Sequence, residues 1–309
     1  MDEDLNPPVS GGMLATSALR GEMRVRAMIM LVAASIMFAL MAFVTKIVSS
    51  RIPGAQVAVI RFVVSLAPIL VPAVRRAAFR VQRLDLLAYR GIFGGFAVLL
   101  FFTAIEHIPV GTATLLNYTS PVFAGIFAAV FLGENLHARV LVPLGATLSG
   151  VALVSIAHQS ATEILGFGPF ELAGLGSAVM AGAAVTAMRG ARRTESTWAT
   201  LMSFSFVGLI ATMPFGIWKW ISPRPFEWAL LVLVGLFALA GQLLMTWSYR
   251  WIETLPAGVV AQSSVVVAMA LGAIFLGEEL GPLNLAGTAL TIGGVIAVIT
   301  MTGKSRVLG

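Results

Sequence analysis

The sequence predicts an all-α integral membrane protein with ten transmembrane helices, arranged as two inverted five-helix repeats with both termini inside. Three observations support this fold class: the composition, the blocks of apolar residues, and the similarity of one half of the chain to the other. Of the 309 residues, 58% are hydrophobic and 11% are charged, whereas soluble domains carry about 25% charged residues. So few charges cannot cover the surface of a water-soluble fold of this length.

Ten apolar segments are separated by short polar gaps, and most of them approach the roughly 20 residues that cross a bilayer. The segments are 27–48, 54–74, 86–106, 110–132, 138–157, 169–189, 196–218, 227–249, 256–277 and 282–302. An even number of spans places both termini on one side of the membrane.

The distribution of basic residues predicts which side that is. One set of gaps is rich in arginine and includes Arg75, Arg76, Arg192 and Arg193, whereas the opposite set holds Arg51, Lys219 and Arg224, with Lys46 at a boundary. Cytoplasmic loops carry the excess of Lys and Arg, so we expect an N-in, C-in protein. Residues 1–26 are polar and lack the pattern of a signal peptide, and we expect a disordered cytoplasmic tail there.

The two halves of the chain resemble each other at a fixed spacing. Shifting the sequence by about 144 positions superimposes Phe131–Glu134 on Phe275–Glu278, two identical FLGE stretches. A charged four-residue match at the end of an apolar segment is harder to obtain by chance than apolar matches. The simplest domain organisation is a five-helix repeat at 27–157 and a second at 169–302. Because five is odd, the second repeat enters the membrane upside down.

These residues resemble the EamA-type members of the drug/metabolite transporter superfamily, over residues 27–302. The resemblance rests on Lys46 followed by Arg61-Phe62, on Arg90-Gly91, on Ser120-Pro121 and on the two FLGE stretches. The spacing of Lys46 and Arg61 is similar to the branch that contains S-adenosylmethionine uptake proteins. The resemblance implies a central cavity and alternating access, with a small-molecule substrate that the family does not fix.

Two basic residues within the apolar segments are candidate substrate-binding residues, because a charge inside a bilayer is costly and needs a reason. Lys46 lies near the outer end of the first segment, where it could reach the headgroups, face a cavity or pair with a polar neighbour. Arg61 follows Gly54 by seven residues, or about 10 Å of helix. We expect Arg61 to face protein or a water-filled cavity, either contacting substrate or bonding a helix end.

The fourth segment is the most polar and carries further candidates. Asn117 and Tyr118 lie near its middle, and Pro121 removes a backbone donor and frees a carbonyl around position 117. Gln262, with two serines after it, occupies the equivalent place in the second half. Two polar patches at one depth suit a pseudo-symmetric site, and we expect Asn117, Tyr118 and Gln262 to line the cavity. Gln242, deep in the eighth segment, is the sixth candidate substrate-binding residue.

Other chemistry is not favoured by the sequence. There is no cysteine, and the three histidines have no ligand-spaced partner, so we expect no metal, no cofactor and no catalytic residues. No basic face interleaved with aromatic residues suggests nucleic acid. For Glu134 and Glu278 we favour bonding an adjacent helix end over proton coupling.

The sequence therefore predicts a secondary transporter in the cell inner membrane, not an enzyme. Its partners would be the lipid bilayer, a small-molecule substrate and a coupling proton or ion. Candidate substrates are an amino acid or an S-adenosylmethionine-like compound. A drug or metabolite exporter, a channel and a membrane protein without transport are the alternatives, and the direction of transport stays open.

Overall fold

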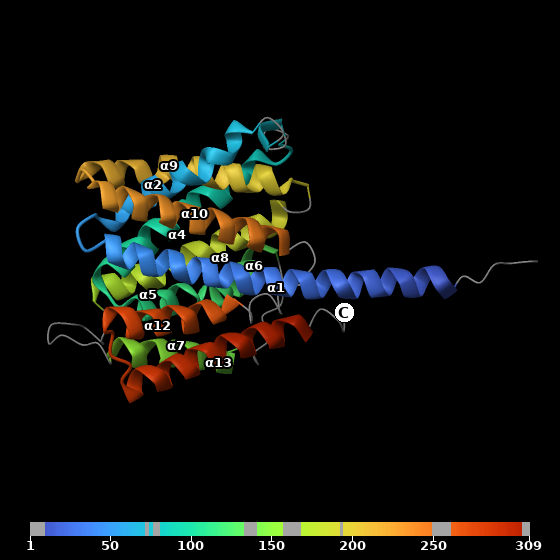
Figure 1. Cartoon of the computed structure of the whole chain (residues 1–309). Coiled ribbons are helices and arrows are strands. Elements are labelled where there is room, and N and C mark those ends of the chain that lie inside the picture. The colour runs from blue at the N-terminus through green and yellow to red at the C-terminus, as the bar shows by residue number, and fades with distance from the viewer. Residues whose placement is uncertain are drawn as a thin grey trace, which may run out of the picture.

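The structure is a computed structural model that describes residues 10–71, 74–76, 81–132, 141–156, 168–191, 194–248 and 261–304. These residues form helices and connecting turns, with no strand among them. The helices run side by side in one bundle, and α1 extends well beyond it (Figure 1). The start of α1 and the end of α13 lie on the same side of the bundle (Figure 1).

The described residues of the first half of the chain form the following α-helices and one short 3₁₀ helix. They are α1 (Ser10–Val48), α2 (Gly54–Leu66), η1 (Ala67–Leu70), α4 (Leu84–His107), α5 (Val110–Asn117), α6 (Ser120–Leu132) and α7 (Leu141–Ile156). The second half contains α8 (Pro169–Ala191), α9 (Thr197–Trp218), α10 (Pro225–Ser248), α12 (Ser263–Leu276) and α13 (Pro282–Lys304).

Several of these helices are long and apolar enough to cross a membrane. Within the described residues there are five: Val25–Val48 of α1, Leu84–His107, Pro169–Met188, Thr197–Trp218 and Pro225–Ser248. Shorter apolar helices cover Gly54–Leu70, Ser263–Leu276 and Pro282–Ala297. Large apolar side chains such as Ile210, Phe215 and Leu236 stand exposed on the bundle, as expected of surfaces that face lipid. The protein is an all-α membrane protein.

Equivalent helices of the two halves begin at opposite ends of the bundle. We call these ends the Gly54 end, where α2 begins, and the Arg83 end, where α4 begins. The Gln56 amide pairs with the backbone of Ile221, just before α10, so α10 also begins at the Gly54 end. Helix α4 and its counterpart α10 therefore run in opposite directions, which is the arrangement of an inverted repeat.

The packing has the same symmetry. Contacts between α4 and α8 correspond to those between α1 and α10 when the halves are exchanged, and α4 against α9 corresponds to α10 against α2. The pairs α2·α9 and α7·α13 are their own equivalents. Most helix pairs that pack together thus join the two halves, so neither half forms an isolated bundle.

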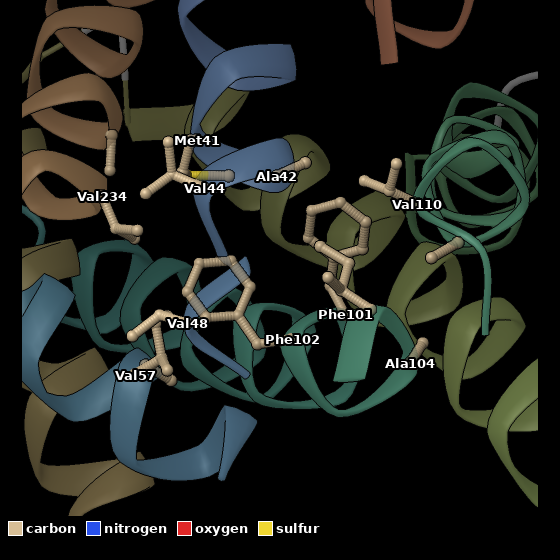
Figure 2. Packing of buried hydrophobic residues seen from close by; sticks show 14 of the residues in the cluster. Met41, Ala42, Val44, Val48, Val57, Phe101, Phe102, Ala104, Val110 and Val234 are labelled. Atoms are coloured by element: carbon tan, nitrogen blue, oxygen red, sulfur yellow. The ribbon is translucent and has the colours of Figure 1, made fainter. Parts of the chain in front are cut away.

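The main apolar core lies where α1, α2, α4, α5 and α10 meet. Phe102 is fully buried there, with Val48, Val57 and Val234 in the same cluster. Figure 2 shows Phe101 and Phe102 of α4 directed toward α1, between α10 and α5. This core holds the Gly54 half of the bundle together and fixes the ends of α4 and α1, on which several candidate residues lie.

Three predicted boundaries differ from the structure. Helix α1 begins at Ser10, so residues 10–26 are helical where we expected a disordered tail; the good helix formers Ala, Leu, Met, Glu and Arg explain this. The second segment ends at Leu70, just before Pro72, because proline cannot continue a helix. The fourth segment is two helices, α5 and α6, rather than one. Residues 249–260 of the eighth and ninth segments lie outside the described residues.

Candidate functional site

The fourth span is interrupted at its middle. Helix α5 ends at Asn117 and α6 begins at Ser120, with Tyr118 and Thr119 between them. Thr119 closes the end of α5 by donating from its hydroxyl to the Leu116 carbonyl, at 2.7 Å. Pro121, at the second position of α6, has no backbone N–H and suits the first turn of a helix. This break is consistent with the prediction that Pro121 disturbs the helix near residue 117.

The second half has an interruption at the equivalent position. Ala261 is helical, Gln262 lies in a turn, and α12 begins at Ser263. A shift of 144 residues places Tyr118 on Gln262, so the two breaks occupy matched positions of the repeat. The Gln262 backbone keeps helical dihedral angles, with φ −62° and ψ −20°, so this interruption is milder than the one at Tyr118, where ψ is 7°.

The two breaks are bonded to each other. The Gln262 side-chain amide donates to the Tyr118 carbonyl at 3.2 Å. The Tyr118 hydroxyl donates to the Ser264 hydroxyl at 2.9 Å, and Ser264 donates to the Ser35 carbonyl on α1 at 2.9 Å. This chain of hydrogen bonds connects α1, the α5–α6 break and the α12 break.

Asn117 adds a further bond between the halves. Its side-chain amide donates to the Ser177 hydroxyl of α8 at 2.9 Å, and Ser177 donates in turn to the Gly174 carbonyl. We call Asn117, Tyr118, Ser177, Gln262 and Ser264 the helix-break cluster. Polar groups of this kind, held at the junction of two repeats, can bind the polar groups of a substrate.

Glu278 lies at the Gly54 end, where it meets the start of α5. Gly277 has a φ of 67°, the left-handed conformation that glycine adopts without strain. This turn folds Glu278 back against Gly272. Its carboxylate accepts from the backbone N–H groups of Val110, at 2.6 Å, and Gly111, at 3.4 Å. The N-cap of α5 is Pro109, which makes no side-chain cap, so the second half supplies the acceptor that this helix end needs.

Glu106 does the same for α2. Its carboxylate accepts from the Gly54 N–H at 2.7 Å, because Pro53 at the N-cap makes no side-chain hydrogen bond. Lys46 lies between these acids: both Glu278 and Glu106 act on its ammonium group electrostatically. The ammonium donates to the carbonyls of Ile108, at 2.9 Å, and Glu106, at 3.4 Å, at the end of α4. Lys46, Glu106 and Glu278 form the Gly54-end cluster.

The structure separates the six predicted substrate-binding residues. Asn117, Tyr118 and Gln262 come together in the helix-break cluster, and that they line a substrate cavity stays a prediction. Lys46 lies at the Gly54 end, and Arg61 is buried among α2, α4 and α9. Gln242 is half-buried on α10 and makes no recorded hydrogen bond in the described part of the chain. Glu134, the counterpart of Glu278, lies outside the described residues.

A surface pocket of about 520 Å³ lies near the Gly54 end, away from the helix-break cluster. Its lining comes from the start of α2 and the adjacent ends of α4 and α9, and consists of Pro53, Ala55, Thr103, Glu106, Pro214, Phe215, Trp218 and Lys219. None of the six predicted residues lines it. The helix-break cluster joins both halves, whereas Phe215 and Trp218 at the pocket stand exposed on the bundle.

Sequence reasoning missed several participants. Ser177, Ser35 and Glu106 gave no signal, because serine is common in membrane helices and an acid near a helix end is unremarkable. The sequence placed Arg90 at the edge of the third segment, among the basic residues of the arginine-rich gaps, whereas the structure buries it, 6% exposed, within α4.

Comparison with known proteins adds the family. A model of the EamA-like transporter family matches residues 25–156 and 169–300. The pseudopaline exporter CntI of Pseudomonas aeruginosa is 26% identical over 274 residues, covering 86% of this chain and 93% of the exporter. A probable terminal-alkyne amino-acid exporter of Streptantibioticus cattleyicolor is 29% identical over 232 residues, covering 74% and 77%. A solved crystal structure with 18% identity has a TM-score of 0.62 and covers 93% of this chain and 99% of its own.

A bundle of apolar helices built from two repeats, with two interrupted helices bonded at its centre, defines a multi-pass membrane transporter for a small molecule. Both repeats match the same family model, and the solved structure shares the fold over nearly the whole chain. The chain belongs to the EamA-like transporter family.

Proposed function

We propose that this protein is an exporter that moves a small amino-acid-like metabolite out of the cell across the inner membrane by alternating access. Ten transmembrane helices, in five-helix units at 27–157 and 169–302, would have both termini in the cytoplasm, so that the Gly54 end faces outward. The observation that carries the proposal is the hydrogen bond from the Gln262 amide to the Tyr118 carbonyl, which joins the two helix breaks.

The helix breaks support a moving substrate site. Interrupted helices at a repeat interface offer free backbone groups to a ligand and act as hinges between the halves. Asn117, Tyr118 and Gln262 would contact the substrate by exchanging their mutual hydrogen bonds for bonds to it. Two halves of similar sequence and opposite direction give two conformations of similar energy, one open to each side.

The Gly54-end cluster supports a state closed to the outside. Glu278 from the second half bonds the start of α5 in the first half, and Lys46 bonds the end of α4. Opening this end requires Glu278 to leave the α5 N-terminus. The Lys46 ammonium would then become available to an acidic group on the departing substrate or to the Glu278 carboxylate.

The relatives support export and the substrate class. The two similar proteins with named cargo are exporters, one of pseudopaline and one, as a probable assignment, of terminal-alkyne amino acids. We therefore favour export over uptake, and an amino acid over an S-adenosylmethionine-like compound.

Counterflow in proteoliposomes tests the proposal. Purified protein would be reconstituted in vesicles preloaded with one unlabelled amino acid at a time, and later with S-adenosylmethionine, and uptake of the labelled compound would be followed. A carrier gives a transient overshoot that saturates with substrate, whereas a channel gives none. An imposed pH gradient in a second set of vesicles tests coupling to protons.

Variants connect the transport to the helix-break cluster. Gln262→Leu should reduce counterflow at least tenfold, while Thr212→Val should leave it unchanged, because the Thr212 hydroxyl bonds only carbonyls of its own helix. Equal rates in these two variants would contradict the proposed site. No overshoot with any compound in the panel would contradict the proposed cargo.

A further inference from the structure

Arg61 is a buried cation for which the described structure provides no anionic partner. The residue lies in the middle of α2 and is 2% exposed. Its Nε and Nη1 atoms have no hydrogen-bond partner, and no ion pair to Arg61 occurs within the described residues. Its charged neighbour is another arginine, Arg90 of α4.

Aromatic rings surround the two guanidinium groups. The Arg61 guanidinium carbon lies 4.8 Å from the centre of the Phe62 ring and 5.4 Å from that of Phe204. The Arg90 guanidinium carbon lies 4.0 Å from the centre of the same Phe204 ring. Phe62 and Phe204 meet edge to face, with ring centres 5.3 Å apart. Two cations from different helices thus converge on one aromatic ring of α9.

Glycines make this convergence possible. A Cβ atom added at Gly94 would meet the Arg90 guanidinium and lie 2.6 Å from the Phe204 ring, and one added at Gly208 would lie 2.7 Å from the Phe62 ring. Because glycine has no side chain, α4 and α9 can bring the rings and the guanidinium groups close to the helix backbones.

Attraction to aromatic rings offsets only part of the cost of burying a cation. Two like charges at close range add repulsion, and no anionic group of the described residues compensates it at Arg61. A buried charge normally has a partner. Because no anionic partner for Arg61 occurs among the described residues, and its Nε and Nη1 donors lack acceptors there, an anionic ligand would suit this position.

We propose that Arg61, together with Arg90, forms an anion site for a carboxylate group of the transported molecule. This inference rests on the proposed function and narrows its substrate class to carboxylates. A guanidinium fork matches the two oxygens of a carboxylate. The site is built from α2, α4 and α9 and is therefore separate from the helix-break cluster, which involves α1, α5, α8 and α12.

Thermal unfolding of the purified full-length protein in detergent tests the anion site directly. The probes are sodium acetate and sodium succinate, with sodium chloride at equal ionic strength and the uncharged amides acetamide and succinamide as references. A ligand that binds only the folded state raises Tm with its concentration. We expect the carboxylates to raise Tm by several degrees over chloride and over the amides, in a saturating manner.

Variants assign this response to Arg61. Arg61→Gln should abolish the carboxylate-specific shift, Arg61→Lys should retain part of it, and Lys219→Gln, which removes an exposed cation elsewhere, should retain all of it. If Arg61→Gln does not fold, Gly94→Ala replaces it, because the added methyl crowds Arg90 and Phe204 without removing a charge, and it should weaken the shift. The proposal is overturned if carboxylates and chloride raise the Tm of the wild-type protein equally. It is also overturned if the carboxylate-specific Tm shift is unchanged in Arg61→Gln or, where that variant does not fold, in Gly94→Ala.

Counterflow separates this inference from the proposed function. Saturable counterflow without a carboxylate-specific Tm shift would support the proposed carrier mechanism and contradict the proposed anion site. A Tm shift that depends on Arg61, in a protein that shows no counterflow, would support the anion site and contradict the carrier mechanism.

Discussion

Buried cations have different surroundings at the Gly54 end and in the interior around Arg61. At the Gly54 end, Lys46 lies between two acids and bonds two carbonyls at the end of α4, and each acid bonds the start of a helix. Around Arg61, two cations share aromatic rings and Arg61 lacks partners for Nε and Nη1. The comparison shows that Lys46 has acceptors and acidic neighbours within the described residues, whereas Nε and Nη1 of Arg61 have none.

The largest effect should come from disturbing the Gly54 end itself. An added Cβ at Gly54 would lie 2.6 Å from the carbonyl carbon of Phe102 on α4, and backbone cannot move aside as a side chain can. We expect Gly54→Val to destabilise the protein by about 3 kcal/mol or to prevent its accumulation, measured as Tm and yield in detergent. Gly145→Val is the matched control, because nothing lies within 4 Å of a Cβ atom added there. Equal losses in both variants would mean that the helix contact is not the cause.

Removing the Glu278 carboxylate should have the next largest effect. Glu278→Ala leaves the Val110 and Gly111 N–H groups without their acceptor, and hydrogen bonds to charged groups contribute about 1.5–3 kcal/mol. Glu278→Gln keeps an acceptor oxygen and should lose less. The measurement is Tm of both variants, together with labelling of a cysteine introduced at Val110 to report opening. If labelling does not increase in Glu278→Ala, the carboxylate does not close this end.

Variants at the helix breaks should lose less stability than variants at the Gly54 end, but more transport activity. Gln262→Leu removes the hydrogen bond from the Gln262 amide to the carbonyl of the half-buried Tyr118, at a cost of about 1–2 kcal/mol. Tyr118→Phe removes only the hydroxyl that bonds Ser264, and we expect about 1 kcal/mol or less. Chemical unfolding in mild detergent compares the two variants. A larger loss in Tyr118→Phe would mean that the Tyr118–Ser264 bond, rather than the bond between the breaks, holds the cluster.

Some of these features could be predicted from the sequence, and others could not. The FLGE repeat and Pro121 are local features, so the repeat and the disturbed fourth helix followed from the sequence. The partners of Glu278 lie 167 and 168 residues away, and the partner of Asn117 lies 60 residues away. No local pattern specifies such pairs, since they depend on how inverted helices pack. Gln242 was singled out for its polarity alone, and polarity does not say which face of a helix meets the neighbouring half.

The smallest effect should come from the rim of the Gly54 end, where Arg51 of the α1–α2 turn forms a bidentate ion pair with Glu227. The Glu227 carboxylate raises the pKa of the Arg51 guanidinium above its usual value, so the pair stays charged over the whole neutral range. The pair is half-buried and lies at the rim of the bundle, where water and salt still screen it and reduce its contribution. We expect Arg51→Ala to lower Tm less than any variant above, and added salt to shrink the difference further. A Tm loss as large as that of Glu278→Ala would mean that this rim pair, rather than the buried acids, keeps the Gly54 end closed. Lys46 would then be a candidate to bind substrate, as is proposed for Arg61.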